Sequence, residues 1–279
     1  DRAARHVAIS DEAVHLPGVA PTDTYLNVAA IIDAAHATGA QAIHPGYGFL
    51  SENADFAEAV AASGLTWIGP PPEATRAIGD KIRARKIAES AGVPIVPGTL
   101  EPLKNAAEVV AFGKEHGYPL AIKAAGGGGG RGLKVARSED GVVAAFESAR
   151  REAISYFSNE DVFIERYLEN PKHLEVQLLA PNPDEALWLG VRDCSLQRRH
   201  QKLVEETPSP GVDDALRARI GQIAVDAARA AGYRSAGTIE GLLTGAGEYF
   251  FMEMNTRIQV EHTVTEVVTG LDLIREQVL

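Results

Sequence analysis

Residues 126–130 are five consecutive glycines, and this run limits where regular structure can lie around it. Each glycine costs about 0.5–1 kcal/mol relative to alanine inside a helix or strand, because glycine loses the most backbone freedom on folding. The segments on either side, 120–125 and 131–136, are predicted to be strands. We therefore expect a hairpin whose turn is formed by Gly126, Gly127, Gly128, Gly129 and Gly130.

Consecutive glycine amides can turn toward one concavity and bind an anion, most commonly a triphosphate. Lys123 lies three residues before the run and Arg131 directly after it, so cations flank the loop. A flexible turn or linker is the alternative interpretation. The pattern GxxxxGK followed by Ser or Thr is absent, and a strand is predicted to follow, so this is not a Walker A loop. The pattern favours a flap that closes over phosphates.

The first part of the chain alternates predicted helices and strands, which is typical of a parallel α/β layer. The expected helices are 25–38 and 53–63, and the expected strands are 42–43 and 66–69, with a proline turn at 70–72. Ligands of such sheets bind beyond the carboxyl ends of the strands. The loop HPGYGFLSE at 44–52 has that position and is a candidate ligand loop.

The later part of the chain predicts an α+β arrangement with antiparallel strand pairs. The expected helices are 81–91, 140–153 and 216–231, and the expected strands are 161–165, 174–179, 186–192, 238–243 and 248–254. The chain does not begin with Met and stops within a helical pattern that starts near Leu271. We therefore expect a piece of a longer protein.

Composition excludes several function classes. The net charge of −11 disfavours sequence-independent nucleic-acid binding, which needs a cationic surface. No run of about 18 apolar residues is present, so no membrane span is expected. Cys194 is the only cysteine, which excludes an internal disulfide and favours a cytoplasmic location. A buried free thiol is a better interpretation of Cys194 than a nucleophile.

Residues 238–257 predict a hairpin with a turn at Gly245-Ala246, which would pair Thr244 with Gly247. This register places Glu240 opposite Phe251, so that Glu253 lies diagonally from Glu240 on the same face. Diagonal neighbours are about 7–8 Å apart at the backbone, within reach of a shared ion for two glutamates. Asn255, two residues further on, stays on that face, unless a bulge shifts the register.

Two glutamates and an asparagine offer only oxygen ligands, which suits Mg²⁺ rather than a structural zinc. Mg²⁺ is usually completed by substrate phosphates, in agreement with the glycine loop. The alternative is a solvated strand face, where glutamate is common. The residues expected on the opposite, buried face are Ile239, Leu243, Phe250 and Met252.

The segment 253–262, EMNTRIQVEH, alternates polar residues, which would project to one side of an extended strand. Arg257 offers a planar fork for a small planar anion, and Gln259 can add a donor. Glu261, beside this arginine, is a candidate general base. A polar edge strand is the alternative. In the segment 193–208, the candidates for ribose, phosphate or anion contacts are Gln197, His200 and Lys202, whereas Arg198 and Arg199 are expected to be solvated.

Seven blocks, in this order, resemble the biotin carboxylase family of the ATP-grasp superfamily over nearly the whole chain. They are HPGYGFLSEN from His44, IGDK from Ile78, IKAAGGGGGRG from Ile122, ERYLENPKH from Glu165, RDCSLQRRHQKLVEE from Arg192, GTIE from Gly237 and EMNTRIQVEH from Glu253. The resemblance implies a Rossmann-like pre-ATP-grasp α/β sheet, partial, at 1–78. It also implies an α+β ATP-grasp domain at 79–279, with a mobile glycine-rich lid at about 95–167.

The resemblance also implies roles for particular residues. Lys81 and Lys123 would contact ATP phosphates, with adenine at a hinge formed by Glu165 and the backbone near Leu168. The further nucleotide contacts would be His173, Gln197, His200 and Leu242. The ligands of Mg²⁺ (or Mn²⁺) would be Glu240, Glu253 and Asn255. Bicarbonate would be held by Lys202, Arg257, Gln259 and the amide of Val260, and Glu261 would deprotonate it.

The implied reaction is ATP-dependent carboxylation of biotin on a carrier protein, through carboxyphosphate, as the first half-reaction of a bacterial acetyl- or propionyl-CoA carboxylase of fatty acid biosynthesis. The implied partners are a biotin carboxyl carrier domain and a carboxyltransferase subunit, with a homodimer possible for the full-length protein. A C-terminal domain, with an arginine that stabilises the biotin enolate, is expected beyond Leu279.

The chain departs from the family pattern at three places. Gly241 replaces the usual aromatic residue, Thr263 replaces the usual proline, and the hairpin turn at 244–247 is one residue longer. Two alternatives stay open: another ATP-grasp ligase, such as a carbamoyl-phosphate synthase domain, and a nucleotide-binding fragment without turnover. The HPGYGFLSEN and RDCSLQRRHQK blocks favour the biotin enzyme over the first alternative.

Overall fold

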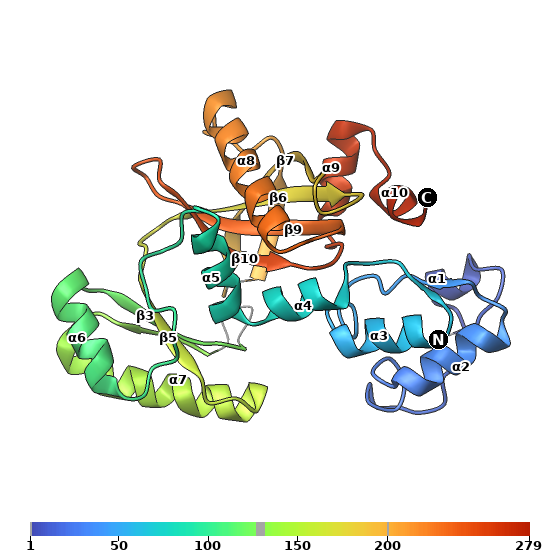
Figure 1. Cartoon of the computed structure of the whole chain (residues 1–279), viewed down its shortest axis with the longest axis horizontal. Coiled ribbons are helices and arrows are strands. Elements are labelled where there is room, and N and C mark those ends of the chain that lie inside the picture. The colour runs from blue at the N-terminus through green and yellow to red at the C-terminus, as the bar shows by residue number, and fades with distance from the viewer. Residues whose placement is uncertain (1, 127–131, 200) are drawn as a thin grey trace.

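A computed structural model describes residues 2–126, 132–199 and 201–279. Three bodies are visible in Figure 1: an N-terminal α/β unit, a central sheet, and a smaller sheet with two helices (green) that lies apart from both. Helices α4 (Pro72–Gly79) and α5 (Lys81–Ser90) run between these bodies. None of the described helices is long and apolar enough to cross a membrane.

The N-terminal unit is the parallel α/β layer that the sequence predicts. Strands β1 (Ala42–Ile43) and β2 (Thr66–Trp67) pair in parallel, joined by α3 (Ala54–Ala62). The short α1 (Arg5–Ala8) and α2 (Val28–Ala37) precede them. Asn27 and Asn53 cap α2 and α3 by accepting backbone N–H groups three residues on, which fixes where both helices begin.

Helix α4 begins where only a proline turn was expected. Pro72 is its first residue, a position where a missing N–H costs nothing and the fixed φ of proline already suits a helix. Its buried residues Ala74, Ala77 and Ile78 lie between polar ones at helical spacing. The prediction of a simple turn was therefore wrong, because proline was taken as the end of structure rather than as a helix start.

The smaller sheet lies within the expected lid. It has the strand order β4-β3-β5, all antiparallel, from β4 (Leu133–Ala136), β3 (Leu120–Ala124) and β5 (Val162–Arg166). Its other elements are α6 (Ala106–His116), the short 3-10 helix η1 (Glu139–Gly141) and α7 (Val142–Phe157). Ile122, Phe146 and Ile164 are buried between α7 and the sheet. Helix α6, capped by Asn105, was missed from the sequence.

The central sheet has the order β10-β9-β6-β7-β8, with antiparallel pairs throughout its described part. Its strands are β6 (Lys172–Ala180), β7 (Leu187–Arg198), β8 (Gln201–Glu206), β9 (Ser235–Leu243) and β10 (Tyr249–Asn255). Helix α8 (Asp214–Ala230) covers one face (Figure 1). The chain then continues through α9 (His262–Thr269) and α10 (Leu273–Val278).

The two faces of the central sheet differ in chemistry because side chains alternate along a strand. Leu174, Val176 and Leu178 of β6 face the core under α8. Glu175 and Gln177, between them, are also fully buried but lie on the other face. The apolar face therefore anchors the sheet, and the opposite face carries polar groups that need partners.

The β9–β10 hairpin has a different register from the expected one. The turn is one residue longer, because the Thr244 N–H donates to the Glu248 carbonyl, and a bulge follows between Phe251 and Glu253. Together these shifts place Glu253 directly opposite Glu240. The acids therefore share a face as expected, but as a direct pair instead of a diagonal one. The bulge also turns Met252 toward the cavity, whereas Phe251 and Met254 are buried in the core.

The tyrosine ring of Tyr249 occupies the space beside Gly241. A Cβ on Gly241 would lie 2.2 Å from the ring Cζ, so this ring from the opposite strand leaves no room for a side chain at position 241. Gly241→Ala should therefore lower the free energy of unfolding by about 1–3 kcal/mol, as overpacking does. Denaturant unfolding measures this, with Gly245→Ala as control, because a Cβ there meets nothing within 4 Å. Equal stability of the two variants would contradict this packing.

Candidate active site

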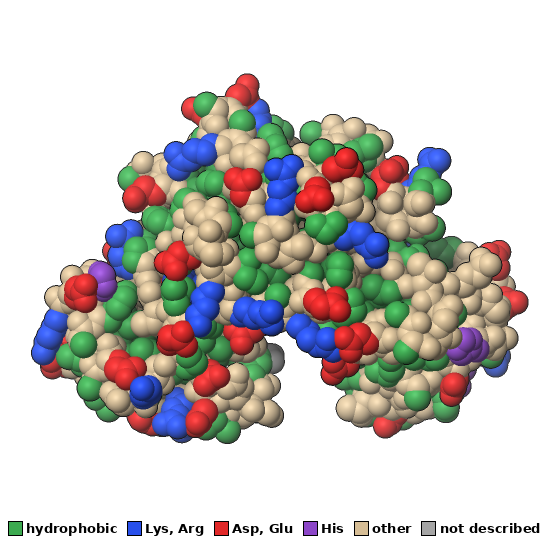
Figure 2. Space-filling model, viewed as in Figure 1, with side chains coloured by type: hydrophobic (Ala, Val, Ile, Leu, Met, Phe, Trp, Pro, Cys, Tyr) green, Lys and Arg blue, Asp and Glu red, His purple; other side chains and the backbone are tan. Residues whose placement is uncertain are grey.

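A cavity of about 640 Å³ lies between the smaller sheet and the polar face of the central sheet. Figure 2 shows that the molecule is hollowed between the smaller sheet and the N-terminal unit, with charged side chains of both signs along the edge of the hollow. The expected site residues that line the cavity are Lys81, Lys123, Glu165, Leu168, His173, Gln197, Lys202, Glu240, Leu242, Glu253, Asn255, Arg257, Gln259, Val260 and Glu261.

The remaining expected residues belong to the glycine run and its neighbourhood. Gly126 lies two residues after the end of β3, and a Cβ there would lie 3.2 Å from the Cβ of Phe157 in α7. Gly127, Gly128, Gly129, Gly130 and His200 lie outside the described residues. The structure thus brings together the expected residues from both sides of the cavity. Anion binding by the glycine amides stays a prediction.

Glu240 is held by donors from four directions. Its Oε1 accepts hydrogen bonds from Asn255 Nδ2 at 2.7 Å, Lys202 Nζ at 3.0 Å and Gln259 Nε2 at 3.1 Å. Its Oε2 lies 2.8 Å from His173 Nε2. Burial opposes ionisation, but the contacts with His173 and Lys202 outweigh it, so the pKa of Glu240 lies well below its usual value. This carboxylate is therefore ionised and fixed in orientation.

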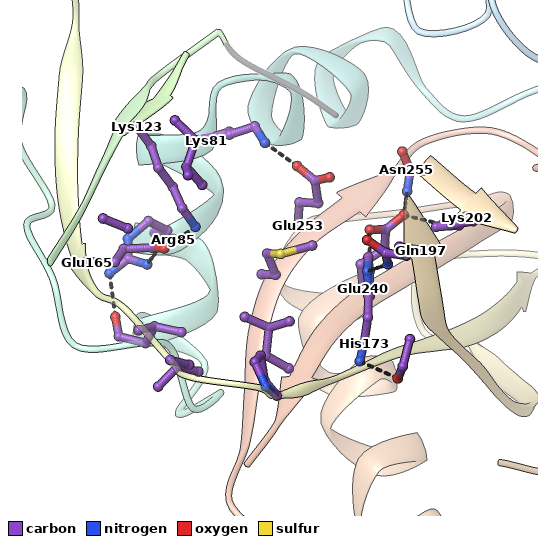
Figure 3. A pocket seen from close by; sticks show the side chains of 18 of the residues that line it. Lys81, Arg85, Lys123, Glu165, His173, Gln197, Lys202, Glu240, Glu253 and Asn255 are labelled. Atoms are coloured by element: carbon purple, nitrogen blue, oxygen red, sulfur yellow. Dashed lines mark hydrogen bonds and ion pairs between the residues drawn. The ribbon is translucent and has the colours of Figure 1, made fainter. Parts of the chain in front are cut away.

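Cations and acids that line the cavity form ion pairs with one another. Figure 3 shows Lys81, at the start of α5, reaching Glu253 on β10, and Lys123, on β3, directed toward Glu165 on β5. Glu165 also binds Arg85. Each lysine expected at the phosphates is thus paired with a carboxylate in this structure, so an anionic ligand would have to exchange these partners.

Lys202 joins three carboxylates at the far end of the cavity. It pairs with Glu175, with Glu240 and with Glu261, whose Oε1 lies 2.8 Å from Nζ. Burial lowers the pKa of Lys202, but Glu240 and Glu261 outweigh it and the net shift is upward. Burial likewise raises the pKa of Glu261, yet the hydrogen bond from Lys202 makes the net shift downward. Glu261 is therefore an ionised carboxylate that can accept a proton.

The segment 256–261 after the hairpin is not a strand, so the expectation of an extended strand was wrong there. β10 ends at Asn255, and the chain bends before Glu261 at the start of α9. Glu52 of the N-terminal loop holds this bend, because its carboxylate accepts the Thr256 N–H at 3.1 Å and the Arg257 Nε–H at 3.0 Å. The loop at 44–52 therefore reaches the cavity region as predicted, and its Tyr47 and Gly48 line the cavity.

Arg192 is a functional candidate that the sequence interpretation missed. It is fully buried on the polar face of β7. Its guanidinium donates to both Glu175, at 3.2 Å, and Gln259 Oε1, at 3.1 Å, and three further acceptors complete the set: Gln177, Thr265 and Thr238. The Gln259 side-chain oxygen accepts a hydrogen bond from Arg192, so the Nε2 of Gln259 must point toward Glu240. In the sequence, Arg192 is the first residue of the family-like block RDCSLQRRHQK, but no residue pattern there indicates its role.

Arg192→Met should lower the free energy of unfolding by about 3 kcal/mol or more, because removing one partner leaves buried Glu175 without its guanidinium. Denaturant unfolding of the two proteins measures the difference. Arg198→Met is the matched control, since Arg198 is exposed at the end of the same strand. A loss no larger than that of the control would show that Lys202 alone satisfies Glu175.

Cys194 is buried and free, as the sequence interpretation expected. Burial is the largest influence on its thiol and raises the pKa far above the usual value, despite the nearby Arg192. A thiol that stays protonated is a poor nucleophile. Cys194 is therefore not a candidate nucleophile.

Two family models match the chain. The biotin carboxylase N-terminal domain matches residues 1–75, and the ATP-binding domain of the carbamoyl-phosphate synthase L chain matches residues 80–279. The chain is 53% identical to the biotin-dependent acyl-coenzyme A carboxylase alpha3 subunit of Mycobacterium leprae, covering 99% of this chain and 46% of that protein. It is 52% identical to the biotin carboxylase of Haemophilus influenzae, covering 99% of this chain and 62% of the relative. The chain thus spans about half to three fifths of these relatives.

Solved structures give the same picture. The biotin carboxylase domain dimer of Hydrogenobacter thermophilus 2-oxoglutarate carboxylase, in complex with MgADP, ADP and bicarbonate, has a TM-score of 0.94 and 47% identity, over 99% of this chain and 61% of that one. The Campylobacter jejuni biotin carboxylase–beta-gamma-ATP complex has a TM-score of 0.92 and 43% identity, over 94% of this chain and 59% of that one. The N-terminal family model and the names of these relatives favour the biotin enzymes over carbamoyl-phosphate synthase. This chain belongs to the biotin carboxylase family and has its ATP-grasp fold.

Proposed function

We propose that this chain catalyses the ATP- and Mg²⁺-dependent carboxylation of biotin on a carrier protein, with bicarbonate as the carbon source. The observation that carries the proposal is one cavity in which the opposed Glu240–Glu253 pair faces Lys81 and Lys123. In this proposal, residues 1–78 are part of the N-terminal domain. Residues 79–279 are the ATP-grasp domain, with 95–167 as its lid.

The nucleotide would lie between the lid and the central sheet. Lys81 and Lys123 would exchange their carboxylate partners for phosphate oxygens, as compact point charges can. Adenine would lie at Glu165 and Leu168, where β5 leads out of the smaller sheet. The further contacts in this proposal are His173, Gln197, Leu242 and, beyond the described residues, His200 and the glycines at 127–130.

The donor set of the acid pair suits Mg²⁺. Glu240 and Glu253 lie directly opposite each other, so their side chains are separated by about 4.5–5.5 Å at Cβ, and Asn255 adds an amide oxygen. We assign these three residues to the metal. Bound Mg²⁺ would supply positive charge against the phosphate oxygens during transfer. The protein's own contribution is to hold Glu240 ionised and fixed in orientation through His173 and Lys202, while Lys81 would leave Glu253 free for the metal.

Bicarbonate would bind beside the acid pair, on Lys202, Arg257, Gln259 and the Val260 amide. Glu261 would take its proton, and the resulting oxyanion would attack the γ-phosphorus of ATP, giving ADP and carboxyphosphate. Carboxyphosphate would separate into CO₂ and phosphate. The phosphate would take the ureido N–H proton of biotin, and that nitrogen would attack CO₂. Lys202 and Arg257 stabilise negative charge in these steps, and exclusion of water by the lid protects the intermediate.

The assembly belongs to the same proposal. The relatives include a propionyl-CoA carboxylase alpha chain from Ruegeria pomeroyi, 46% identical over 100% of this chain and 41% of that one. We infer partners of the corresponding kind: a biotin carboxyl carrier domain and a carboxyltransferase subunit of an acetyl- or propionyl-CoA carboxylase. A homodimer, as in the Hydrogenobacter thermophilus structure, and a cytoplasmic location are further parts of the proposal.

Phosphate release from ATP tests the proposal. It should require bicarbonate and Mg²⁺ and should increase when free biotin is added. The ATP-binding family match favours carbamoyl-phosphate synthase chemistry as a second candidate. Release stimulated by ammonia, with carbamoyl phosphate as product, would support that candidate instead. ATP binding without any bicarbonate-dependent release would identify a nucleotide-binding protein without turnover.

A further inference from the structure

Arg85 lies on α5 in the wall of the cavity, and the proposed reaction gives it no role. Arg85 is buried, with only 1% of its surface exposed to solvent. One nitrogen, Nη1, binds Glu165 Oε1, and Nη2 donates to the Val96 carbonyl at 2.8 Å. The guanidinium carbon lies 5.7 Å from the centre of the Phe163 ring. A fully buried arginine is costly unless such partners neutralise and satisfy it.

These partners lie where the chain enters and leaves the lid. Val96 lies on the segment that enters the lid, and Glu165 lies on the segment that leaves it. Backbone hydrogen bonds join these two segments. The Arg166 N–H donates to the Pro97 carbonyl at 2.8 Å, and the Thr99 N–H donates to the Ile164 carbonyl at 2.9 Å. Arg85 therefore ties both crossings to the same helix that carries Lys81.

Gly98 shows how closely the two crossings pack. A Cβ there would lie 2.2 Å from the Ile164 carbonyl oxygen and 3.0 Å from Arg85 Nη2. The backbone contact therefore leaves no room for the crossings to shift past the guanidinium. Arg85 and the two crossings therefore pack as one unit at the base of the proposed lid.

Glu165 is shared by two cations. Arg85 binds Oε1, whereas Lys123 on β3 binds Oε2. Burial opposes ionisation of this carboxyl group, but Lys123 and Arg85 outweigh it, so the pKa of Glu165 is lowered. If Lys123 leaves for a phosphate, the carboxylate still has one cation. Without Arg85, the same departure would strand a buried negative charge.

We infer that Arg85 is a positioning residue for the nucleotide: it neutralises Glu165 at the two lid crossings, so that Lys123 can transfer from this carboxylate to phosphate. The inference rests on the proposed function, because it requires nucleotide in this cavity. Arginine suits the position because its planar fork serves Glu165 and the Val96 carbonyl together, which a lysine cannot do with the same geometry.

Calorimetric titration with ADP tests the inference without turnover. Arg85→Met should weaken ADP binding by about 10-fold or more, as loss of one partner of a buried charge pair does. Arg85→Lys keeps the charge beside Glu165 but not the planar fork that also reaches the Val96 carbonyl, so it should lose less ADP affinity than Arg85→Met. Arg83→Met is the matched control, because Arg83 is exposed two residues away on the same helix. Equal affinities of Arg85→Met and Arg83→Met would overturn the inference.

A double variant separates positioning from stability. In Arg85→Met/Glu165→Gln no charge is left to hold Lys123, so ADP should bind at least as tightly as to Glu165→Gln alone. Markedly weaker binding by the double variant would contradict the inference, even if Arg85→Met alone fails to fold. Failure of the unchanged protein to bind ADP would instead overturn the proposed function. Thermal unfolding of each variant shows that the titrated protein is folded.

Discussion

Replacing Glu261 with glutamine should slow bicarbonate-dependent ATP cleavage by about 100-fold or more, the usual contribution of a positioned general base. Glutamine keeps the shape of the side chain but cannot take the bicarbonate proton. Burial and Lys202 act in opposite directions on this carboxyl group, and Lys202 prevails, so the base is ionised at neutral pH. Steady-state phosphate release at saturating ATP measures the loss, and ADP affinity should change little.

Glu206→Gln is the matched control for this prediction. Glu206 is exposed at the end of β8, the strand that carries Lys202, and its replacement removes the same charge. Its rate should stay within about twofold of the unchanged protein, as for a surface substitution. A Glu261→Gln protein that cleaves ATP at the control rate would show that another group accepts the proton.

Replacing Glu240 with glutamine should lower Mg²⁺-dependent ATP cleavage by about 100-fold or more, because the metal's charge stabilisation is worth several kcal/mol. The substitution should also disturb the residues that hydrogen-bond to Glu240. An amide carries two N–H donors, so it cannot accept from Lys202, Asn255, Gln259 and His173 as the carboxylate does. Rates measured over a range of Mg²⁺ concentrations should show weaker metal saturation as well as a lower maximum.

Glu248→Gln, exposed beside the turn of the same hairpin, controls for the loss of charge. It should leave the Mg²⁺ dependence unchanged. A Glu240→Gln protein with normal Mg²⁺ saturation but lower thermal stability would indicate a structural role for Glu240 and would remove it from the metal site.

Local signals in the sequence predicted much of this fold. The helix expected at 53–63 is α3, which Asn53 caps, and the strand expected at 174–179 lies within β6. The hairpin acids were correctly placed on one face, although both their turn and their register were wrong. Neither error could be seen locally, because the bulge at Met252 depends on how β10 packs and leaves no sequence pattern.

Tertiary contacts explain what the sequence could not show. Arg85 and Arg192 act through Glu165 and Glu175, which lie far from them in sequence or on a neighbouring strand. Periodicity marks a position as buried, but it does not say which acid neutralises a buried arginine. The bend after Asn255 was missed for a similar reason: Glu52, about two hundred residues earlier, holds it.

A crystal structure with MgADP tests the central claim, that the acid pair, Lys81 and Lys123 bind one metal–nucleotide complex. The account predicts a metal within about 2.1 Å of oxygens from Glu240 and Glu253, the Mg²⁺ distance in proteins. Lys81 and Lys123 should contact phosphate, with their pairs to Glu253 and Glu165 broken. Nucleotide bound elsewhere while both ion pairs stay intact would contradict the account.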